Sequence, residues 1–278
     1  MEQKLTMIHG LVDAGMKHVE VGSFVHPKWI PQMADTAEVL SRLERRDDVS
    51  YWVLVPNMRG LENALKAGAT HIAVFVSSSE SHNKKNLNRT ISESLEGIRE
   101  LADVAGAAGC TIRGYVSTVF GCPYEGDVDF GRVLEITGSL LELGCGQVSL
   151  GDTTGMGTPG QVHTSLTRAL DNYPVEKMAL HLHDTRGLAV ANALTALHVG
   201  FTTFDSSIGG MGGCPYAPGA SGNVGTEDIV NMLHSMGRPT GIDLEKLLMV
   251  SRRLERDYGA TLNSAYFRYS KSAKRPNP

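Results

Sequence analysis

Two histidines and an asparagine carry the spacing in this sequence that most directly suggests chemistry. His181 and His183 alternate with apolar residues in the run M-A-L-H-L-H-D-T-R-G, and a glycine-rich run over 209–222 carries Cys214 and ends beside Asn223. Because successive side chains of a strand point to opposite faces, a spacing of two directs both imidazoles to one side. Imidazole and oxygen ligands together bind Mg²⁺, Mn²⁺, Fe²⁺ or Zn²⁺. The pattern indicates carbon–carbon bond chemistry on a metal-bound, oxygenated substrate.

Each of these residues also has a purely structural interpretation. The two histidines could satisfy each other or the backbone inside a core, and Asn223 could cap a helix that begins near Thr226. Cys214 could be an inert buried thiol, the usual state of a free cysteine. Its neighbours in G-G-M-G-G-C-P are mostly glycine and cannot build an apolar core around it. We therefore favour metal ligation for the two imidazoles and an exposed, functional thiol. For Asn223 the residues alone favour the helix cap over ligation.

Charged residues interrupt three of the strand-like runs. Glu20 lies between Val19 and Val21, and Arg113 and Asp152 stand in similar runs further along the chain. A charge inside an apolar strand is costly unless it is paired or hydrogen-bonded. A shared polar site at the strand ends would supply those partners. We predict that these three residues line the same site as the histidines.

Strand-like and helix-like segments alternate along the whole chain. After an amphipathic opening helix, the predicted strands span 18–24, 50–56, 70–77, 111–118, 147–153, 178–184 and 203–209. The predicted helices between and after them span 36–46, 58–67, 92–108, 130–143, 159–172, 188–199, 226–235 and 243–258. This alternation is typical of a parallel sheet built from βαβ units.

A barrel fits the pattern better than a doubly wound sheet. No G-x-G-x-x-G follows the first strand, whereas polar candidates occur on nearly every strand, as in (β/α)₈ TIM barrels. Such barrels have eight strands, and here the opening helix has no strand before it. We expect an α/β TIM barrel with seven visible strands and the first strand missing. Residues 1–262 would form the catalytic domain, and 263–278 a polar, flexible tail.

Composition excludes several classes of function. The net charge of -4 is mixed in sign, which argues against binding to nucleic acid or to an anionic membrane. No apolar run reaches the roughly 18 residues that a membrane-spanning helix needs. The four cysteines show no C-x-x-C pairing and no disulfide-rich density. We expect a cytoplasmic protein in a reducing compartment.

Longer motifs resemble one enzyme family. They are V-E-V-G-S-F-V-H-P-K-W-I-P-Q-M-A-D, R-G-Y-V-S-T-V-F-G-C-P-Y-E-G, S-L-G-D-T-T-G-M-G-T-P-G, H-L-H-D-T-R-G-L-A-V-A-N and D-S-S-I-G-G-M-G-G-C-P-Y-A-P-G-A-S-G-N-V-G-T-E-D. Together they resemble the 3-hydroxy-3-methylglutaryl-CoA lyases of the metallolyase and Claisen-type synthase superfamily. The resemblance covers nearly everything from Leu5 to about Arg253, and the loop around Cys214 is its most specific part.

The resemblance implies a site and a reaction. It implies that Mg²⁺ or Mn²⁺ is bound by His181, His183 and Asn223. It implies further catalytic or cavity-lining roles for Cys214, Asp152, Glu20 and Arg113, with Glu227 behind the asparagine. The implied reaction cleaves (S)-3-hydroxy-3-methylglutaryl-CoA to acetoacetate and acetyl-CoA, as in leucine degradation and ketone body formation. Asp152 or a histidine would take the hydroxyl proton, and His181 or Cys214 would protonate the acetyl carbon. The family also implies a homodimer.

A basic stretch follows the third visible strand. Lys84, Lys85 and Asn86 lie in S-H-N-K-K-N-L-N. Such a charge pair is usually a solvated face. A loop at the carboxyl ends of barrel strands would instead bring these residues to the phosphates of coenzyme A. We retain both interpretations.

Two other functions stay open from the sequence. A related condensing synthase or aldolase would consume acetyl-CoA with a 2-oxo acid, but those enzymes tend to carry G-E-R-x-G-N in place of the cysteine loop. A non-catalytic barrel remnant would bind no metal. Metal analysis and the direction of the reaction separate these alternatives.

The start of the chain generates a prediction. In the family, the first strand carries an R-D-G-L-Q segment whose Asp binds the metal and whose Arg steadies the enolate, and no such segment stands ahead of the first visible strand. We expect the 278-residue chain to bind metal weakly and to turn over slowly. Loss of one oxyanion donor alone costs about 10²–10³ in kcat. Full activity in a metal-dependent acetoacetate assay on this chain would contradict the expectation.

Overall fold

One parallel sheet organises the molecule, and its strands lie side by side in chain order. The computed structural model describes residues 1–212 and 222–272. The strands are β1 (His18–Ser23), β2 (Ser50–Leu54), β3 (His71–Ser77), β4 (Thr111–Ser117), β5 (Gln147–Asp152), β6 (Met178–Leu182) and β7 (Phe204–Asp205). Every neighbouring pair is parallel, so the predicted α/β class and all seven strands are confirmed.

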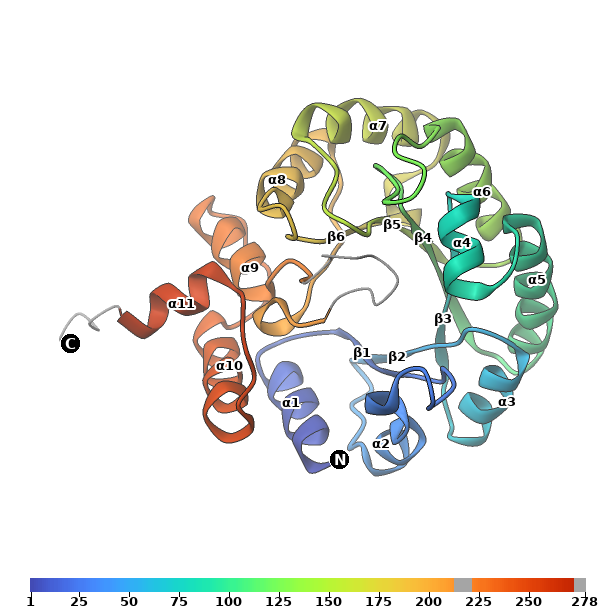
Figure 1. Cartoon of the computed structure of the whole chain (residues 1–278). Coiled ribbons are helices and arrows are strands. Elements are labelled where there is room, and N and C mark those ends of the chain that lie inside the picture. Colours follow the sequence, from blue (N-terminus) through green and yellow to red (C-terminus); the bar gives the residue numbers. More distant parts are fainter. Residues whose placement is uncertain (213–221, 273–278) are drawn as a thin grey trace.

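The helices cover the outside of the curved sheet (Figure 1). They are α1 (Glu2–Asp13), α2 (Thr36–Arg42), α3 (Met58–Lys66), α4 (Glu80–Leu87), α5 (Ile91–Ala107), α6 (Phe130–Glu142), α7 (Pro159–Asn172), α8 (Ala189–Val199), α9 (Thr226–Ser235), α10 (Leu244–Tyr258) and α11 (Ala265–Ser272). The strands curve around a common axis as in a TIM barrel. Among the described residues no strand lies between the edges β1 and β7, so the ring is open there.

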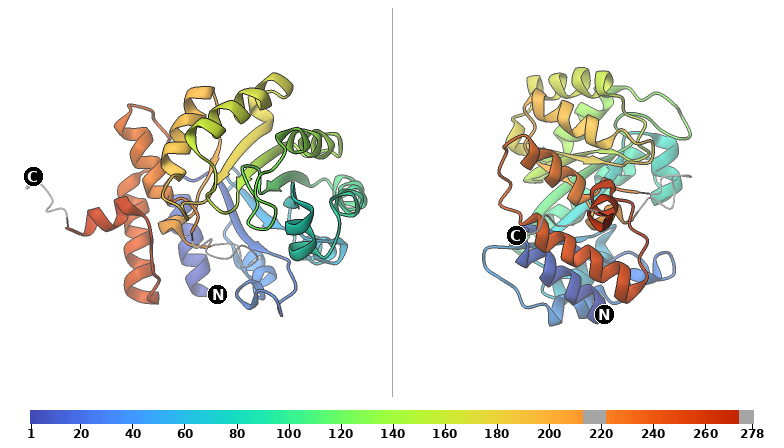
Figure 2. Two further views of the ribbon diagram at one scale, coloured as in Figure 1. Left: turned by 45° about the horizontal axis from the view of Figure 1, so that its top comes forward. Right: turned by 90° about the vertical axis from the view of Figure 1, so that its left-hand side faces the viewer.

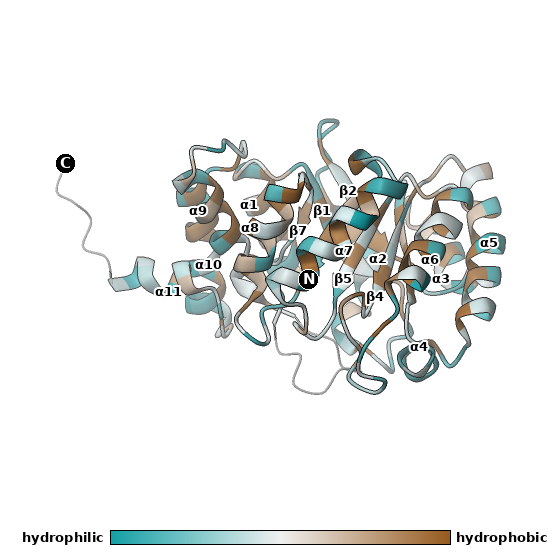
Figure 3. Ribbon diagram, turned by 90° about the horizontal axis from the view of Figure 1, so that it is seen from above, coloured by the Kyte–Doolittle hydropathy of each residue, from teal (hydrophilic) through white to brown (hydrophobic). Residues whose placement is uncertain are grey.

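Helix burial follows the expected periodicity. The apolar sides of the helices turn toward the sheet and their polar sides toward solvent (Figure 3). In α6, for example, Val133, Ile136 and Leu140 are buried at a spacing of three and four residues. A second, smaller core joins α10 to α1 and α9 (Figure 2), and Leu247 is its fully buried centre. Among the described helices, none combines the length and the apolar character needed to cross a bilayer.

Two segments differ from the expectation. The stretch with Lys84 and Lys85 is not a loop but helix α4, because Ser79 caps its N-terminus by accepting the His82 N–H at 3.1 Å. The tail expected to be flexible from 263 onward contains α11. Its Phe267 is fully buried in a further small cluster with Leu248 of α10 and Leu262, which anchors the helix.

A bulge in β1 sets the orientation of the strand at its carboxyl end. Glu20 pairs with Trp52, but Gly22 and not Val21 pairs with Val53, so one extra residue is inserted. Glycine is needed at this point because a Cβ on Gly22 would lie 2.6 Å from the Thr36 hydroxyl. The bulge therefore lets α2 pack directly against the strand that carries Glu20.

Candidate active site

The two histidines and the asparagine meet at the carboxyl end of β6. The ring centroids of His181 and His183 are 5.2 Å apart. The segment after the glycine-rich loop pairs with the end of β6 through an antiparallel bridge between His183 and Asn223. Val224 N–H donates to the Leu182 carbonyl at 3.0 Å, which fixes that bridge. Backbone pairing thus brings the amide, far along the chain, to the imidazoles.

Three donor atoms in this group are buried without a hydrogen-bond partner among the described residues. They are Nδ1 of His181, Nδ1 of His183 and Oδ1 of Asn223. The amide is held in place, since its Nδ2 donates to the Met211 carbonyl at 2.9 Å. Burial lowers the pKa of His183 to about 3, so this imidazole is neutral at physiological pH. Imidazole nitrogens and an oriented amide oxygen without hydrogen-bond partners fit a divalent cation.

The competing interpretation of Asn223 as a helix cap does not hold. Helix α9 begins at Thr226, its N-cap is Gly225, and no side chain bonds to that cap. Of the three residues in the candidate metal group, the two histidines belong to the ligand types His, Cys, Asp and Glu, and Asn223 does not. In the part of the chain that the structure describes, no cluster of three His, Cys, Asp or Glu side chains could hold a metal ion.

A polar network crosses the interior of the ring beneath the histidines. Arg113 on β4 donates to Asp205 on β7 at 2.8 Å and to the Tyr115 hydroxyl at 3.0 Å. Tyr115 donates to Glu20 on β1 at 3.1 Å. Ser149 on β5 donates to the second oxygen of Asp205 at 2.7 Å. The network therefore links both edges of the open sheet to its centre.

Asp205 also faces one of the imidazoles. Its Oδ2 lies 3.7 Å from His181 Nδ1, beyond hydrogen-bond distance. Burial by itself would raise the pKa of Asp205, but the charge of Arg113, the nearby imidazole of His181 and the hydrogen bond from Ser149 hold that pKa below its ordinary value. The carboxylate is therefore ionised, and it is the negative charge toward which His181 turns.

Glu20 points into the space enclosed by the strands. Its side chain is exposed to that space, but it lies deep inside the ring, and this loss of bulk water raises its pKa. The Tyr115 bond and the nearby charge of Arg113 oppose the shift. The structure thus brings Glu20 to the cavity that the histidines line, whereas Arg113 belongs to the network beneath and is not among the lining residues.

Asp152 lies differently from the sequence expectation. Its two carboxylate oxygens accept the backbone N–H groups of Met156 at 2.9 Å and Gly157 at 3.0 Å. The side chain is 1% exposed, and burial raises its pKa to about 6. It holds the turn after β5, and it is not among the residues that line the cavity described next.

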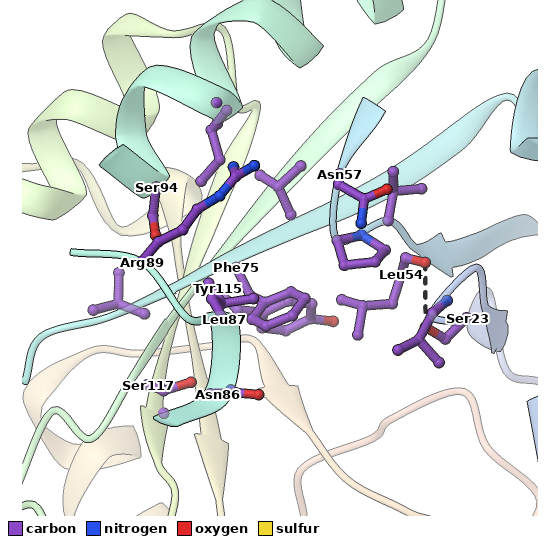
Figure 4. A pocket seen from close by; sticks show the side chains of 18 of the residues that line it. Ser23, Leu54, Asn57, Phe75, Asn86, Leu87, Arg89, Ser94, Tyr115 and Ser117 are labelled. Carbon is purple, nitrogen blue, oxygen red and sulfur yellow. Dashed lines mark hydrogen bonds between the residues drawn. The ribbon is translucent and has the colours of Figure 1, made fainter. Parts of the chain in front are cut away.

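A cavity of about 700 Å³ opens from this group toward α4 and α5. Its inner end is lined by Glu20, Tyr115, His181, His183 and Asn223. Figure 4 shows its middle, where Phe75, Leu87 and Tyr115 lie together, and its outer part, where Arg89 and Ser94 are neighbours.

The predicted basic stretch contributes unequally to this cavity. Lys85 and Asn86 line it, whereas Lys84 does not. The Lys84 ammonium donates to the Asn88 carbonyl at 3.3 Å, at the end of α4. The Lys85 ammonium lies 3.6 Å from the centre of the Tyr124 ring. Because the two lysines are neighbours on a helix, their side chains point in different directions, and only Lys85 lines the cavity.

Cys214 lies outside the described residues, so its predicted role stays a prediction. The turn that leads toward it is well defined. Gly209 N–H donates to both carboxylate oxygens of Glu227, at 2.9 and 3.0 Å. Ser251 on α10 also donates to that carboxylate. Glu227 thus anchors the start of the glycine-rich run from behind.

Two members of the site were missed in the sequence. Tyr115 bridges Arg113 to Glu20, and Ser149 supports Asp205. The run R-G-Y-V-S contained the signal for Tyr115, because it places polar residues at a spacing of two on the face that Arg113 shares. Nothing local marked Ser149, since its partner comes from a strand 56 residues away.

Comparisons with known proteins agree on one family. Residues 1–254 match the family model described as HMGL-like. The hydroxymethylglutaryl-CoA lyase YngG of Bacillus subtilis is 48% identical over 272 residues, covering 98% of this chain and 91% of that protein. The mitochondrial hydroxymethylglutaryl-CoA lyase of Bos taurus is 51% identical and covers 88% and 75%. An HMG-CoA lyase from Acinetobacter baumannii, solved with coenzyme A and 3-methylmalate, is 38% identical with a TM-score of 0.93, covering 99% and 90%.

Replacing Asp205 with asparagine should destabilise the fold by about 3 kcal/mol, because Arg113 would keep a buried charge without its counter-ion. The pair is well buried, with side chains 13% and 18% exposed. Urea denaturation at neutral pH measures the free energy of unfolding. The matched control is Asp103→Asn on the exposed side of α5, with an expected change within about 0.5 kcal/mol. Equal stabilities of the two variants would contradict this assignment.

Lowering the pH should destabilise the fold because the buried imidazole of His82 on α4 is neutral in the folded chain. This residue is fully buried, and burial lowers its pKa to about 4 from 6.5. Between these values the unfolded chain binds a proton that the folded chain does not, so stability falls as the pH decreases. We expect His82 to account for about 2 kcal/mol of loss between pH 7.5 and pH 5. Between these two pH values, the free energy of unfolding of His82→Gln should fall by about 2 kcal/mol less than that of the unaltered chain. An equal fall in both proteins would count against a buried, neutral imidazole at His82.

Proposed function

We propose that the chain, which belongs to the HMGL-like family, is a carbon–carbon lyase that cleaves (S)-3-hydroxy-3-methylglutaryl-CoA to acetoacetate and acetyl-CoA. The family suggested by the sequence motifs is confirmed by the match over residues 1–254. The observation that carries the proposal is the group of three unpartnered donor atoms at the inner end of a cavity. The close relatives named as hydroxymethylglutaryl-CoA lyases support the choice of substrate.

His181, His183 and Asn223 would hold the divalent cation. When bound, it would act as a Lewis acid and as a template for the hydroxyl and carboxylate oxygens of the substrate. The hydrogen bond from the Asn223 side chain to the Met211 carbonyl and the backbone bridge between Asn223 and His183 keep these side chains in place before anything binds. We propose Mg²⁺ or Mn²⁺ as the ion, in keeping with the family and with the oxygen ligand.

Glu20 is the side chain best placed to take the substrate's hydroxyl proton. It faces the cavity, and its raised pKa favours proton acceptance at physiological pH. The sequence suggested Asp152 or a histidine for this role, but Asp152 has both oxygens engaged by backbone N–H groups. The Tyr115 hydroxyl donates to Glu20 and so orients its carboxylate toward the cavity.

Cleavage of the C2–C3 bond leaves acetyl-CoA as a carbanion that needs a proton and nearby positive charge. Arg113 is the cation in the interior network, although Asp205 neutralises much of its charge. Cys214 remains our proposed proton donor, delivered by the run that Glu227 anchors. Water must be kept from the carbanion, and apolar residues such as Phe75 and Leu87 line the cavity between the two ends.

The remaining parts of the proposal concern the setting of the enzyme. We propose Lys85 and Asn86 as contacts for coenzyme A, because both line the cavity. The HMG-CoA lyase solved with coenzyme A supports an acyl-CoA substrate. We further propose leucine degradation as the pathway, the cytoplasm as the location and a homodimer as the assembly. Cys110, Cys122 and Cys145 are free thiols, in keeping with a reducing compartment.

A metal-binding and cleavage experiment tests the proposal. Titration with Mn²⁺ should show one site, and acetoacetate should appear from the substrate over long incubations and stop on adding EDTA. His183→Ala should lose at least about tenfold in metal affinity, because one of three ligands is removed. His163→Ala on the exposed face of α7 is the matched control and should bind as the unaltered chain does.

Three results would overturn the proposal. Absence of bound metal would favour a non-catalytic barrel. Consumption of acetyl-CoA with a 2-oxo acid, without cleavage, would favour a condensing synthase. Equal metal affinity in the two histidine variants would remove His183 from the site.

A further inference from the structure

Arg89 lies at the outer end of the cavity, on the short link between α4 and α5. Its side chain is exposed and lines the cavity together with Ser94 and Gly97 (Figure 4). The metal-binding group lines the same cavity from the end of β6, across the ring from the link between α4 and α5 (Figure 1). A ligand that spans the cavity would therefore present one end to His181 and the other to Arg89.

The Arg89 guanidinium has no hydrogen bond and no ion pair with the residues that the structure describes. The neighbouring carboxylate of Glu93 is already engaged, since it accepts the Thr90 N–H at 2.8 Å in the capping box of α5. The other cation of the cavity wall, Lys85, lies over the Tyr124 ring. Arg89 is thus a positive group of the cavity wall whose donors are still available.

Gly97 provides the place where the guanidinium lies. A Cβ at Gly97 would come within 2.6 Å of Nη1 of Arg89, which is closer than such contacts are found. The residue is on the first half of α5, in ordinary helical backbone, so the helix itself has no need of glycine there. Helix interiors disfavour glycine, and any side chain at this position would have to displace the end of the Arg89 side chain.

An unpaired guanidinium is well suited to phosphate, because its planar array of N–H donors matches phosphate oxygens in pairs. In an acyl-CoA the acyl group and the phosphates stand at opposite ends of the molecule. If the acyl end occupies the group around His181, as the proposed function requires, the phosphates extend toward α5. Charge, position and free donors then agree on one kind of ligand group.

We propose that Arg89, seated against Gly97, binds a phosphate group of the acyl-CoA substrate and selects coenzyme A thioesters over shorter ones. The proposal rests on the proposed function and adds a specificity-determining pair to it. The phosphate is either the diphosphate or the 3′-phosphate, and the two share the same recognition chemistry.

Binding measurements on the full chain test this pair. Calorimetric titration with coenzyme A, dephospho-coenzyme A and pantetheine gives three dissociation constants for each variant. We expect Arg89→Ala to weaken the affinity for coenzyme A about tenfold, at the lower end of the range for a charge-assisted contact at an exposed site. The affinity for pantetheine should change by no more than about twofold. If dephospho-coenzyme A is weakened equally, the diphosphate is the partner. If dephospho-coenzyme A binds the unaltered chain weakly and Arg89→Ala does not change that affinity, the partner is the 3′-phosphate.

Gly97→Ala gives a second test that does not remove the charge. The added Cβ should displace the guanidinium and weaken coenzyme A several-fold, while thermal stability stays equal or rises. Gly106→Ala in the same helix is the matched control, because no heavy atom lies within 4 Å of the Cβ added there. Arg99→Ala, also on α5, is the control for loss of an arginine. Both controls should bind coenzyme A as the unaltered chain does.

The outcomes separate this inference from the proposed function. If the chain binds coenzyme A and cleaves the substrate but Arg89→Ala binds as tightly, the Arg89 role is wrong and the lyase function stands. Equal weakening of pantetheine would also overturn the Arg89 role, since pantetheine has no phosphate. If the unaltered chain neither binds coenzyme A nor releases acetoacetate, both proposals fail together.

Discussion

The ion pair between Arg113 and Asp205 is the contact on which the interior of this open ring depends. It joins the middle strand β4 to the edge strand β7, and Tyr115 extends the connection to Glu20 on the opposite edge. Hydrogen bonds within the sheet cannot do this, because β1 and β7 are not paired with each other in the described chain. Side chains therefore supply the cross-connections that a closed ladder would give. The same residues surround the proposed catalytic carboxylate, so the stability of the ring and the geometry of the site are coupled.

The sequence allowed the strands and most helices to be predicted because each has a local pattern. Alternating apolar residues marked β6, and spacings of three and four residues marked α6. Helix α4 was missed because it is short and polar, and its beginning depends on Ser79 rather than on an apolar face. Similarly, α11 is held by one buried phenylalanine within a polar stretch and by Asp228 of α9, which accepts the backbone N–H groups at its start.

The site was predictable as residue types but not as contacts. The spacing of the histidines and the glycine run indicated a metal group, and backbone pairing indeed brings Asn223 to His183. No pattern in the sequence could show that Asp152 bonds to the turn after its own strand, or that Asp205 meets a residue 92 positions away. Such partners are selected by three-dimensional proximity. The free donors of Arg89 likewise become visible only when the cavity is seen as a whole.

The open side of the sheet has a consequence for how the protein behaves at high concentration. In the part of the chain that the structure describes, β1 has a neighbouring strand on one side only, and backbone donors and acceptors left free along such an edge can serve as a template for a strand from another molecule, the usual route to edge-to-edge aggregation. Polar side chains that point inward from that edge, His18 and Glu20, oppose such growth because an incoming apolar strand would have to desolvate them. The carboxylate that we assign to proton transfer would then also discourage strand pairing along this edge.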